Sequence, residues 1–166
     1  MKFIAPNNKL LSILLFCFSV YLFGQNNINF KHITPQIKSN TVFINQTAQD
    51  SLGNIWMVCA DGILKYNGYG YHLIPKKEIF PNISNNDYIN HIHKDINKNL
   101  WIKSNNGLLT KYNAYRGKFE NKFDSFKEPI KSINSNKNDV WFITKKGQLY
   151  RFINNKFEMI LTIPNI

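Results

Sequence analysis

The stretch QDSLGNIWMVCADGILKYNG, from Gln49 to Gly68, contains one tryptophan between two turn-forming segments. A similar stretch, KDINKNLWIKSNNGLLTKYN, runs from Lys94 to Asn113, and a looser copy, NSNKNDVWFITKKGQLYRFIN, begins at Asn134. Aligning the three copies on their tryptophans gives steps of 45 and 40 residues. Periods of this length are typical of β-propeller blades, in which each repeat is one antiparallel sheet of four strands.

Each copy has the same residue types at fixed distances from its tryptophan. An aliphatic residue comes directly before the tryptophan, and a glycine follows six residues after it. The shared structural positions are Trp56, Trp101 and Trp141, with Gly62, Gly107 and Gly147. In the first two copies the glycine follows Asp61 or Asn106, and such pairs favour positive φ at both central turn residues. We therefore expect type I′ hairpin turns there.

Short runs of alternating apolar and polar residues surround each tryptophan, and a period of two predicts strands. No stretch after Gln25 is long and periodic enough for a helix. The sequence thus predicts an all-β chain, an incomplete β-propeller with blades at about residues 41–75, 87–124 and 129–163. The segment INFKHITP, residues 28–35, precedes the first blade and resembles an isolated outer strand.

The repeated tryptophan has a structural interpretation. A large ring on the second strand of each blade can fill the space between neighbouring sheets. The alternative is a row of exposed rings on which sugars stack. Because the ring recurs at one fixed place in every copy, we favour packing.

The first residues, MKFIAPNNKLLSILLFCFSVYLFGQ, have the composition of a signal peptide. Lys2 and Lys9 give a positive start, and residues 10–23 are almost all apolar, which suits export better than a membrane span of roughly 20 residues. We expect a signal peptide at residues 1–24, a mature domain at 25–166 and a periplasmic location; a retained membrane anchor is the alternative. Cleavage would leave Cys59 as the only cysteine, without a disulfide partner.

The chain has a formal net charge of +11, and removing Lys2 and Lys9 leaves +9. A basic balance is compatible with an acidic polysaccharide, a membrane surface or a nucleic acid. The lysines are scattered along the chain, and we find no basic helix and no aromatic RNA-binding motif. We therefore expect no nucleic-acid partner.

The pattern Asp-x-x-Gly-x-Ile/Leu-Trp-Ile-x-Thr-x-x-Gly-Leu resembles the two-component regulator propeller repeat. The matching residues are Asp50, Gly53, Ile55, Trp56 and Gly62 in the first copy; Asp95, Leu100, Trp101, Ile102, Ser104, Gly107 and Leu108 in the second; and Trp141, Thr144 and Gly147 in the third. Lys98 stands where the repeat has glycine, so we expect the turn of the second copy to shift its register. Ser135 and Asn138 replace the aspartate and glycine in the third copy.

The resemblance implies the periplasmic sensor region of a hybrid histidine kinase or a related transmembrane regulator. In that family, further blades, a membrane helix and an output domain follow, and many members respond to glycan fragments. We find no kinase motif and no second membrane span in this sequence. We therefore expect this chain to be the first part of a longer protein or a truncated copy, with open blade edges through which it self-associates.

His91 and His93 are the one pair that suggests a metal site, because residues two apart share a face of a strand. Zinc needs further ligands, and we find none nearby, so a polar channel lining or a solvated face is preferred. Asp50 and Asp95 recur at the first turn, where aspartate binds backbone amides. The alternative, a catalytic carboxylate pair, is less favoured because Ser135 holds the third position.

Tyrosines in the outer loops offer rings for stacking on sugars. Tyr69 and Tyr71 flank a glycine in the first copy, and Tyr115 holds a similar place in the second. Packing of these rings on a neighbouring blade is the alternative. Together with His91 and His93, these tyrosines are our candidate ligand-binding residues.

The sequence predicts a binding and sensing module without a metal or cofactor and without catalysis of its own. Its expected ligand is a glycan or another extracellular small molecule. One alternative is a fragment of a secreted propeller that binds or degrades polysaccharide. Another is a secreted scaffold or adhesion protein without signalling output.

Overall fold

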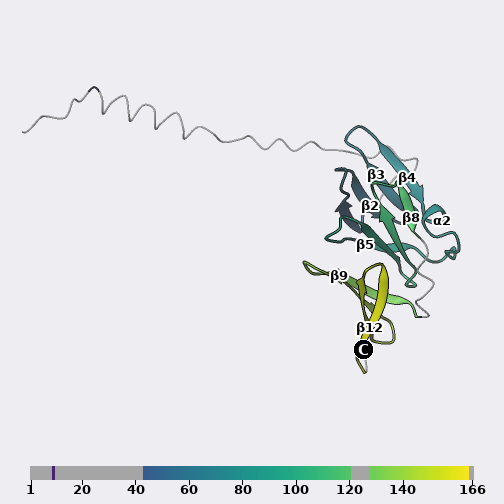
Figure 1. Ribbon diagram of the computed structural model, residues 1–166. Coiled ribbons are helices and arrows are strands. Elements are labelled where there is room, and N and C mark those ends of the chain that lie inside the picture. Colours follow the sequence, from purple (N-terminus) through teal and green to yellow (C-terminus); the bar gives the residue numbers. More distant parts are fainter. Residues whose placement is uncertain (1–8, 10–42, 121–127, 165–166) are drawn as a thin grey trace, which may run out of the picture. The chain divides into compact units, whose positions relative to one another are not determined.

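The computed structural model describes Lys9, residues 43–120 and residues 128–164 (Figure 1). The expected strand at residues 28–35 lies outside these ranges, as does the expected signal peptide apart from Lys9.

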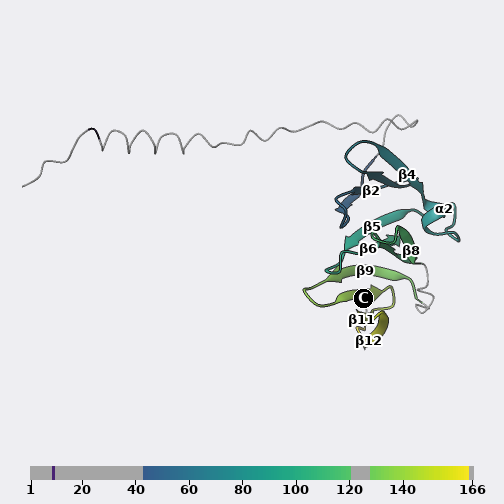
Figure 2. The same ribbon diagram turned by 45° about the horizontal axis from the view of Figure 1, so that its top comes forward.

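The described residues form three antiparallel sheets of four strands, each with its strands in sequence order. Figure 2 shows the third sheet with β9, β11 and β12 in succession. This confirms the predicted fold class of blade-like antiparallel sheets. The strands of the first sheet are β1 (Gln46–Gln49), β2 (Ile55–Cys59), β3 (Gly62–Tyr66) and β4 (Tyr71–Pro75); those of the second are β5 (Ile89–Lys94), β6 (Leu100–Ser104), β7 (Leu109–Asn113) and β8 (Lys118–Glu120); those of the third are β9 (Ile130–Ser135), β10 (Val140–Thr144), β11 (Gln148–Ile153) and β12 (Lys156–Thr162).

One helical turn, α2 (Lys76–Ile79), follows the first sheet and was not expected from the sequence. Its Ile79 is fully buried, and the Lys76 ammonium donates hydrogen bonds to the carbonyls of Asn85 and Asp87. The turn therefore anchors the connection between the first and second sheets. Among the described residues, no helix has the length and apolar character needed to cross a membrane.

The first two repeated tryptophans are fully buried between neighbouring sheets. Trp56 of β2 lies against Tyr112 of β7, with ring centroids 4.4 Å apart, and also contacts Phe119. Trp101 of β6 lies 4.9 Å from both Phe142 and Phe152 of the third sheet. The Trp56–Tyr112 contact is tilted and the other three are edge-to-face. Aromatic pairs stabilise beyond the area that they bury, so each ring couples its sheet to the next.

Trp141, at the same position in the third sheet, is only partly buried and belongs to neither apolar core. Its strand register is nevertheless equivalent, because Trp141 pairs with Arg151 as Trp56 pairs with Lys65 and Trp101 with Lys111. The three tryptophans thus share a place in their sheets but differ in burial.

A buried aspartate closes the first turn of the first and second sheets. Asp50 accepts hydrogen bonds from the backbone amides of Leu52 and Asn54 at Oδ1, and from Asn54 Nδ2 and Trp56 Nε1 at Oδ2. Asp95 repeats this arrangement with Asn99 and Trp101. Burial raises the pKa of Asp50, but the hydrogen bonds together lower it by more, so the pKa lies below its usual value.

The expected register shift at Lys98 does not occur. The amide of Lys98 bonds to the carbonyl of Asp95 as that of Gly53 bonds to Asp50. Lys98 instead adopts a left-handed φ of 63°, close to the 87° of Gly53. The hydrogen bonds around the buried aspartate therefore hold the turn in register at the cost of an unfavourable backbone conformation.

The expectation of type I′ turns at Asp61-Gly62 and Asn106-Gly107 was wrong. A type I′ turn needs positive φ at both central residues, and among the described non-glycine residues only Lys98, Asn154 and Asn155 have it. The adjacent pair Asn154-Asn155 joins β11 to β12 with φ values of 50° and 59°, which fits that turn type.

The repeated glycines have a different role, which is close approach of the backbone. A Cβ atom on Gly62 would lie 2.1 Å from the carbonyl oxygen of Ile74, and one on Gly147 would lie 2.3 Å from that of Ile163. On Gly107 it would lie 2.5 Å from the amide nitrogen of Ile130, which donates a hydrogen bond to the Gly107 carbonyl. Only glycine leaves room for these contacts.

Candidate ligand-binding site

An open pocket of about 870 Å³ lies where the turns of the second sheet meet those of the third. Its wall comes from the β5–β6 turn, from β7, from the β7–β8 loop with β8, and from the β11–β12 region. Such a volume falls within the ~300–1,000 Å³ that is usual for small-molecule sites. The lining residues are Asn97, Asn99, Lys111, Asn113, Arg116, Lys118, Phe119, Glu120, Phe152 and Asn155.

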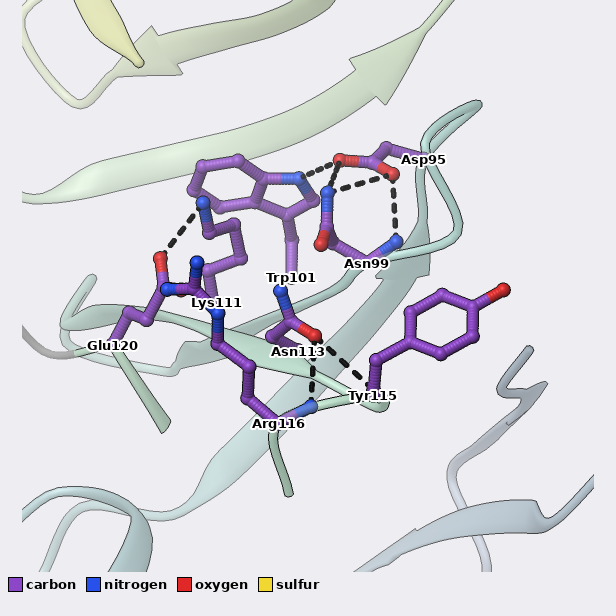
Figure 3. Close-up of polar contacts among 8 residues, drawn as sticks. All are labelled: Asp95, Asn99, Trp101, Lys111, Asn113, Tyr115, Arg116 and Glu120. Atoms are coloured by element: carbon purple, nitrogen blue, oxygen red, sulfur yellow. Dashed lines mark hydrogen bonds and ion pairs between the residues drawn. The ribbon is translucent and has the colours of Figure 1, made fainter. Parts of the chain in front are cut away.

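Lys111 is the buried cation of this pocket, with 7% of its surface exposed. Its ammonium forms an ion pair of 2.8 Å with Glu120 and lies 5.7 Å from the ring centroid of Trp101 (Figure 3). Lys111 stands opposite Trp101 in the strand register, so the repeat that places the tryptophan also places the lysine. The pocket wall is thereby built on the packed junction between two sheets.

Arg116 and Lys118 bring two further cations to the pocket. The Arg116 side chain is 76% exposed and approaches Glu120 only to 4.0 Å. Lys118 is exposed and forms no ion pair with any residue that the structure describes. Among the lining residues that the structure describes, three cations therefore face one carboxylate, which is an excess of positive charge.

Side-chain amides supply the uncharged polar groups of the pocket. Asn113 accepts hydrogen bonds at Oδ1 from the amides of Tyr115 and Arg116, which fixes the β7–β8 loop. Its Nδ2 has no partner among the described residues, and Figure 3 shows it directed away from Tyr115. Asn99 donates from Nδ2 to Asp95, and its Oδ1 accepts no bond within the described chain. The pocket thus offers both amide donors and amide acceptors.

Tyr69 and Tyr115 occupy equivalent loops of adjacent sheets, as the sequence suggests. Each has its amide bound by an asparagine two residues earlier, Asn67 or Asn113. The two residues are 98% and 71% exposed. In Figure 3 the ring of Tyr115 points away from Lys111 and Glu120, and neither tyrosine lines the pocket.

Tyr71 packs on Tyr66 at a ring-centroid distance of 4.8 Å and also stays outside the pocket. The pKa of Tyr71 is raised above its usual value, first by burial and second by the neighbouring Tyr66. This ring therefore has a packing partner within its own hairpin.

His91 and His93 lie on β5, with rings nearly parallel at an angle of 6° and centroids 6.4 Å apart. His93 Nε2 lies 2.8 Å from Ser135 Oγ of the third sheet, whereas His91 Nε2 is buried without a partner among the described residues. Burial, Lys103 and His93 lower the pKa of His91, and burial lowers that of His93 although Asp95 opposes it. Within the described ranges, no three potential ligands gather around a metal position.

The structure therefore places the two histidines and the three tyrosines outside the pocket, and it adds Lys111, Arg116 and Lys118, which the sequence analysis did not single out. One signal was present in the sequence. A basic residue follows each tryptophan after nine or ten residues: Lys65, Lys111 and Arg151.

Comparison with known proteins shows a fold shared with bacterial extracellular domains. The extracellular domain of the one component system BT4673 from B. thetaiotaomicron aligns with 80% of this chain at 20% identity and a TM-score of 0.57. A second structure of the BT4673 extracellular domain, there called a hybrid two component system, gives 21% identity and a TM-score of 0.54, covering 76% of this chain. The extracellular domain of the hybrid two component system BT3049 from the same organism has 22% identity and a TM-score of 0.51, and the alignment covers 74% of this chain.

These likenesses show the propeller-type fold. The chain spans only 18% of the first of these domains and 16% of each of the other two. No family model matches the sequence, and no curated protein matches it.

Proposed function

We propose that this chain contributes three blades to the extracytoplasmic, ligand-sensing propeller of a two-component regulator. The ligand is a glycan or another small molecule from outside the cytoplasm, and the protein acts in the periplasm after export. The fold shared with extracellular domains of BT4673 and BT3049 supports this proposal, as does the repeat pattern around Trp56 and Trp101.

The pocket between the second and third sheets is the observation that carries the binding role. It combines an adequate volume with amide groups and cations that are held in place by the fold. Binding is favoured over catalysis because the repeated carboxylates are already engaged. Asp50 and Asp95 are buried and accept hydrogen bonds from their own turns and tryptophans, so neither is free to act as an acid or a base.

A blocking variant tests this proposal. Asn97→Trp places a large ring on an exposed position of the pocket wall. Leu52→Trp is the matched control, because Leu52 holds the same place in the turn of the first sheet and is 60% exposed. The unmodified chain is screened by thermal shift against neutral and acidic oligosaccharides, and positive ligands are titrated by calorimetry.

We expect at least one saccharide to raise the melting temperature of the unmodified chain and of L52W. The same saccharide should have a much smaller effect on N97W. If no compound in the panel binds, or if both tryptophan variants bind as well as the unmodified chain, the proposed site is wrong.

A further inference from the structure

The described lining of the pocket carries more positive than negative charge, and this excess narrows the ligand class. Lys111 is paired with Glu120 at 2.8 Å, so this carboxylate is largely occupied by the buried ammonium. Arg116 reaches Glu120 only at 4.0 Å from an exposed position, and Lys118 has no ion-pair partner in the part of the chain that the structure describes. Two cations are therefore available to a ligand that brings negative charge of its own.

The uncharged groups restrict the class further. A phosphate or a simple carboxylate needs only cations and donors. This pocket also presents acceptors such as Asn99 Oδ1 beside donors such as Asn113 Nδ2. A hydroxyl group both donates and accepts, so a surface of mixed amides suits a molecule with many hydroxyls. A ligand that matches both features has hydroxyls and carboxylates together.

The guanidinium of Arg116 is suited to a carboxylate because its planar donors match two carboxylate oxygens. Comparison with the first sheet shows that the β7–β8 loop does not need an arginine at position 116 to adopt its conformation. Gly70 occupies the corresponding place after Tyr69, and Asn67 holds that loop as Asn113 holds this one. The arginine is therefore a feature of this pocket rather than of the blade.

We propose that the pocket between the second and third sheets binds an acidic saccharide, whose carboxylate pairs with Arg116 and Lys118 and whose hydroxyls bond to the asparagine amides. This inference rests on the proposed ligand-binding function and specifies its ligand class. Glu120 acts against the ligand charge, so it limits the affinity while it holds Lys111.

The test uses trigalacturonic acid and its methyl ester, which differ in charge but keep the same sugar rings. Binding of each to the full chain is measured by calorimetry at moderate salt. We expect the acid to bind about tenfold more tightly than the ester, because each exposed ion pair contributes roughly 1.5- to 5-fold in affinity.

Two charge variants and one control identify the site. Arg116→Ala with Lys118→Ala should weaken binding of the acid about tenfold and leave the ester nearly unchanged. Lys77→Ala with Lys131→Ala removes two exposed lysines outside the pocket and should have less than a twofold effect. Glu120→Gln should tighten binding of the acid about threefold, an effect that a merely structural role of Glu120 would not produce.

The outcomes separate this inference from the proposed function. Equal binding of acid and ester, both blocked by N97W, overturns the acidic class and leaves a neutral ligand at the same site. Equal loss of affinity in the two double variants overturns the inference, since it shows attraction by overall charge. Absence of binding by both probes also overturns it, whereas the proposed function is then decided by the wider panel with N97W and L52W.

Discussion

The strongest test of the fold concerns the buried aspartate that binds the indole of Trp56. Asp50→Asn preserves size and shape but places an NH2 group where Oδ2 accepts hydrogen bonds from Trp56 Nε1 and Asn54 Nδ2. If the Oδ1 contacts to Leu52 and Asn54 persist, two donors lose their acceptor. An orphaned buried donor costs about 1–3 kcal/mol, so we expect a loss of about 3 kcal/mol in the free energy of unfolding.

A double-mutant cycle isolates the contact to the indole. Trp56→Phe removes the N–H donor, so Asp50→Asn in that background leaves only Asn54 Nδ2 unsatisfied. We therefore expect the aspartate substitution to cost about 1–2 kcal/mol less when Trp56 is absent. The cycle needs the free energies of unfolding of the unmodified chain, the two single variants and the double variant. Urea unfolding followed by far-ultraviolet circular dichroism gives all four without relying on tryptophan emission.

Asp139→Asn is the control, because Asp139 lies in the corresponding turn of the third sheet and its carboxylate forms no hydrogen bond to a described residue. It should change stability by about 0.5 kcal/mol or less. Folding lowers the pKa of Asp50, so the ionised carboxylate stabilises the folded chain. This contribution to the free energy of unfolding is complete above about pH 4 and is lost as the pH falls through the folded-state pKa. Additive free energies in the cycle, within about 0.3 kcal/mol, would refute the proposed role of the aspartate–indole bond.

Three further predictions follow from the turns and from β5. Lys98→Gly should stabilise the chain by about 0.5–1 kcal/mol in urea unfolding, because it relieves a left-handed lysine; destabilisation would contradict this. Gly147→Ala should cost at least about 2 kcal/mol more than Gly117→Ala, since both glycines have positive φ but only a Cβ on Gly147 meets a backbone oxygen at 2.3 Å; equal costs would refute the close-approach argument. His91 and His93 have lowered pKa values in the folded chain, so stability should fall as the pH decreases below about 6.5. In thermal melts at several pH values, the variant with both histidines replaced by glutamine should lose this dependence of stability on pH. An unchanged dependence would show that other groups cause it.

Much of the fold was predictable because its determinants are local. Alternation of apolar and polar residues around Trp56, Trp101 and Trp141 identified the strands, and the 45- and 40-residue steps identified the repeat. The turn errors arose where tertiary contacts override local preference. Asp95 and its hydrogen bonds hold Lys98 in a conformation that lysine disfavours, and the approach of Ile130 explains Gly107 better than any turn type does.

The pocket was harder to predict because its residues come from separate sheets. Asn97 and Lys111 belong to the second sheet and Asn155 to the third, and packing of Trp101 against the third sheet brings the two groups to one pocket. The aspartate–indole bond, in contrast, was within reach of the sequence. An aspartate lies six residues before the buried tryptophan in the first and second copies, whereas Ser135 occupies this position in the third copy.

The uneven burial of the three indoles gives this protein an internal optical probe. Trp56 and Trp101 have no exposed surface and should emit at short wavelength, shielded from acrylamide. Trp141 is partly open to water and should account for the red-shifted, quenchable part of the emission. A molecule that covers the outer face of the third sheet would therefore be detected by the colour of the fluorescence alone, without any attached dye.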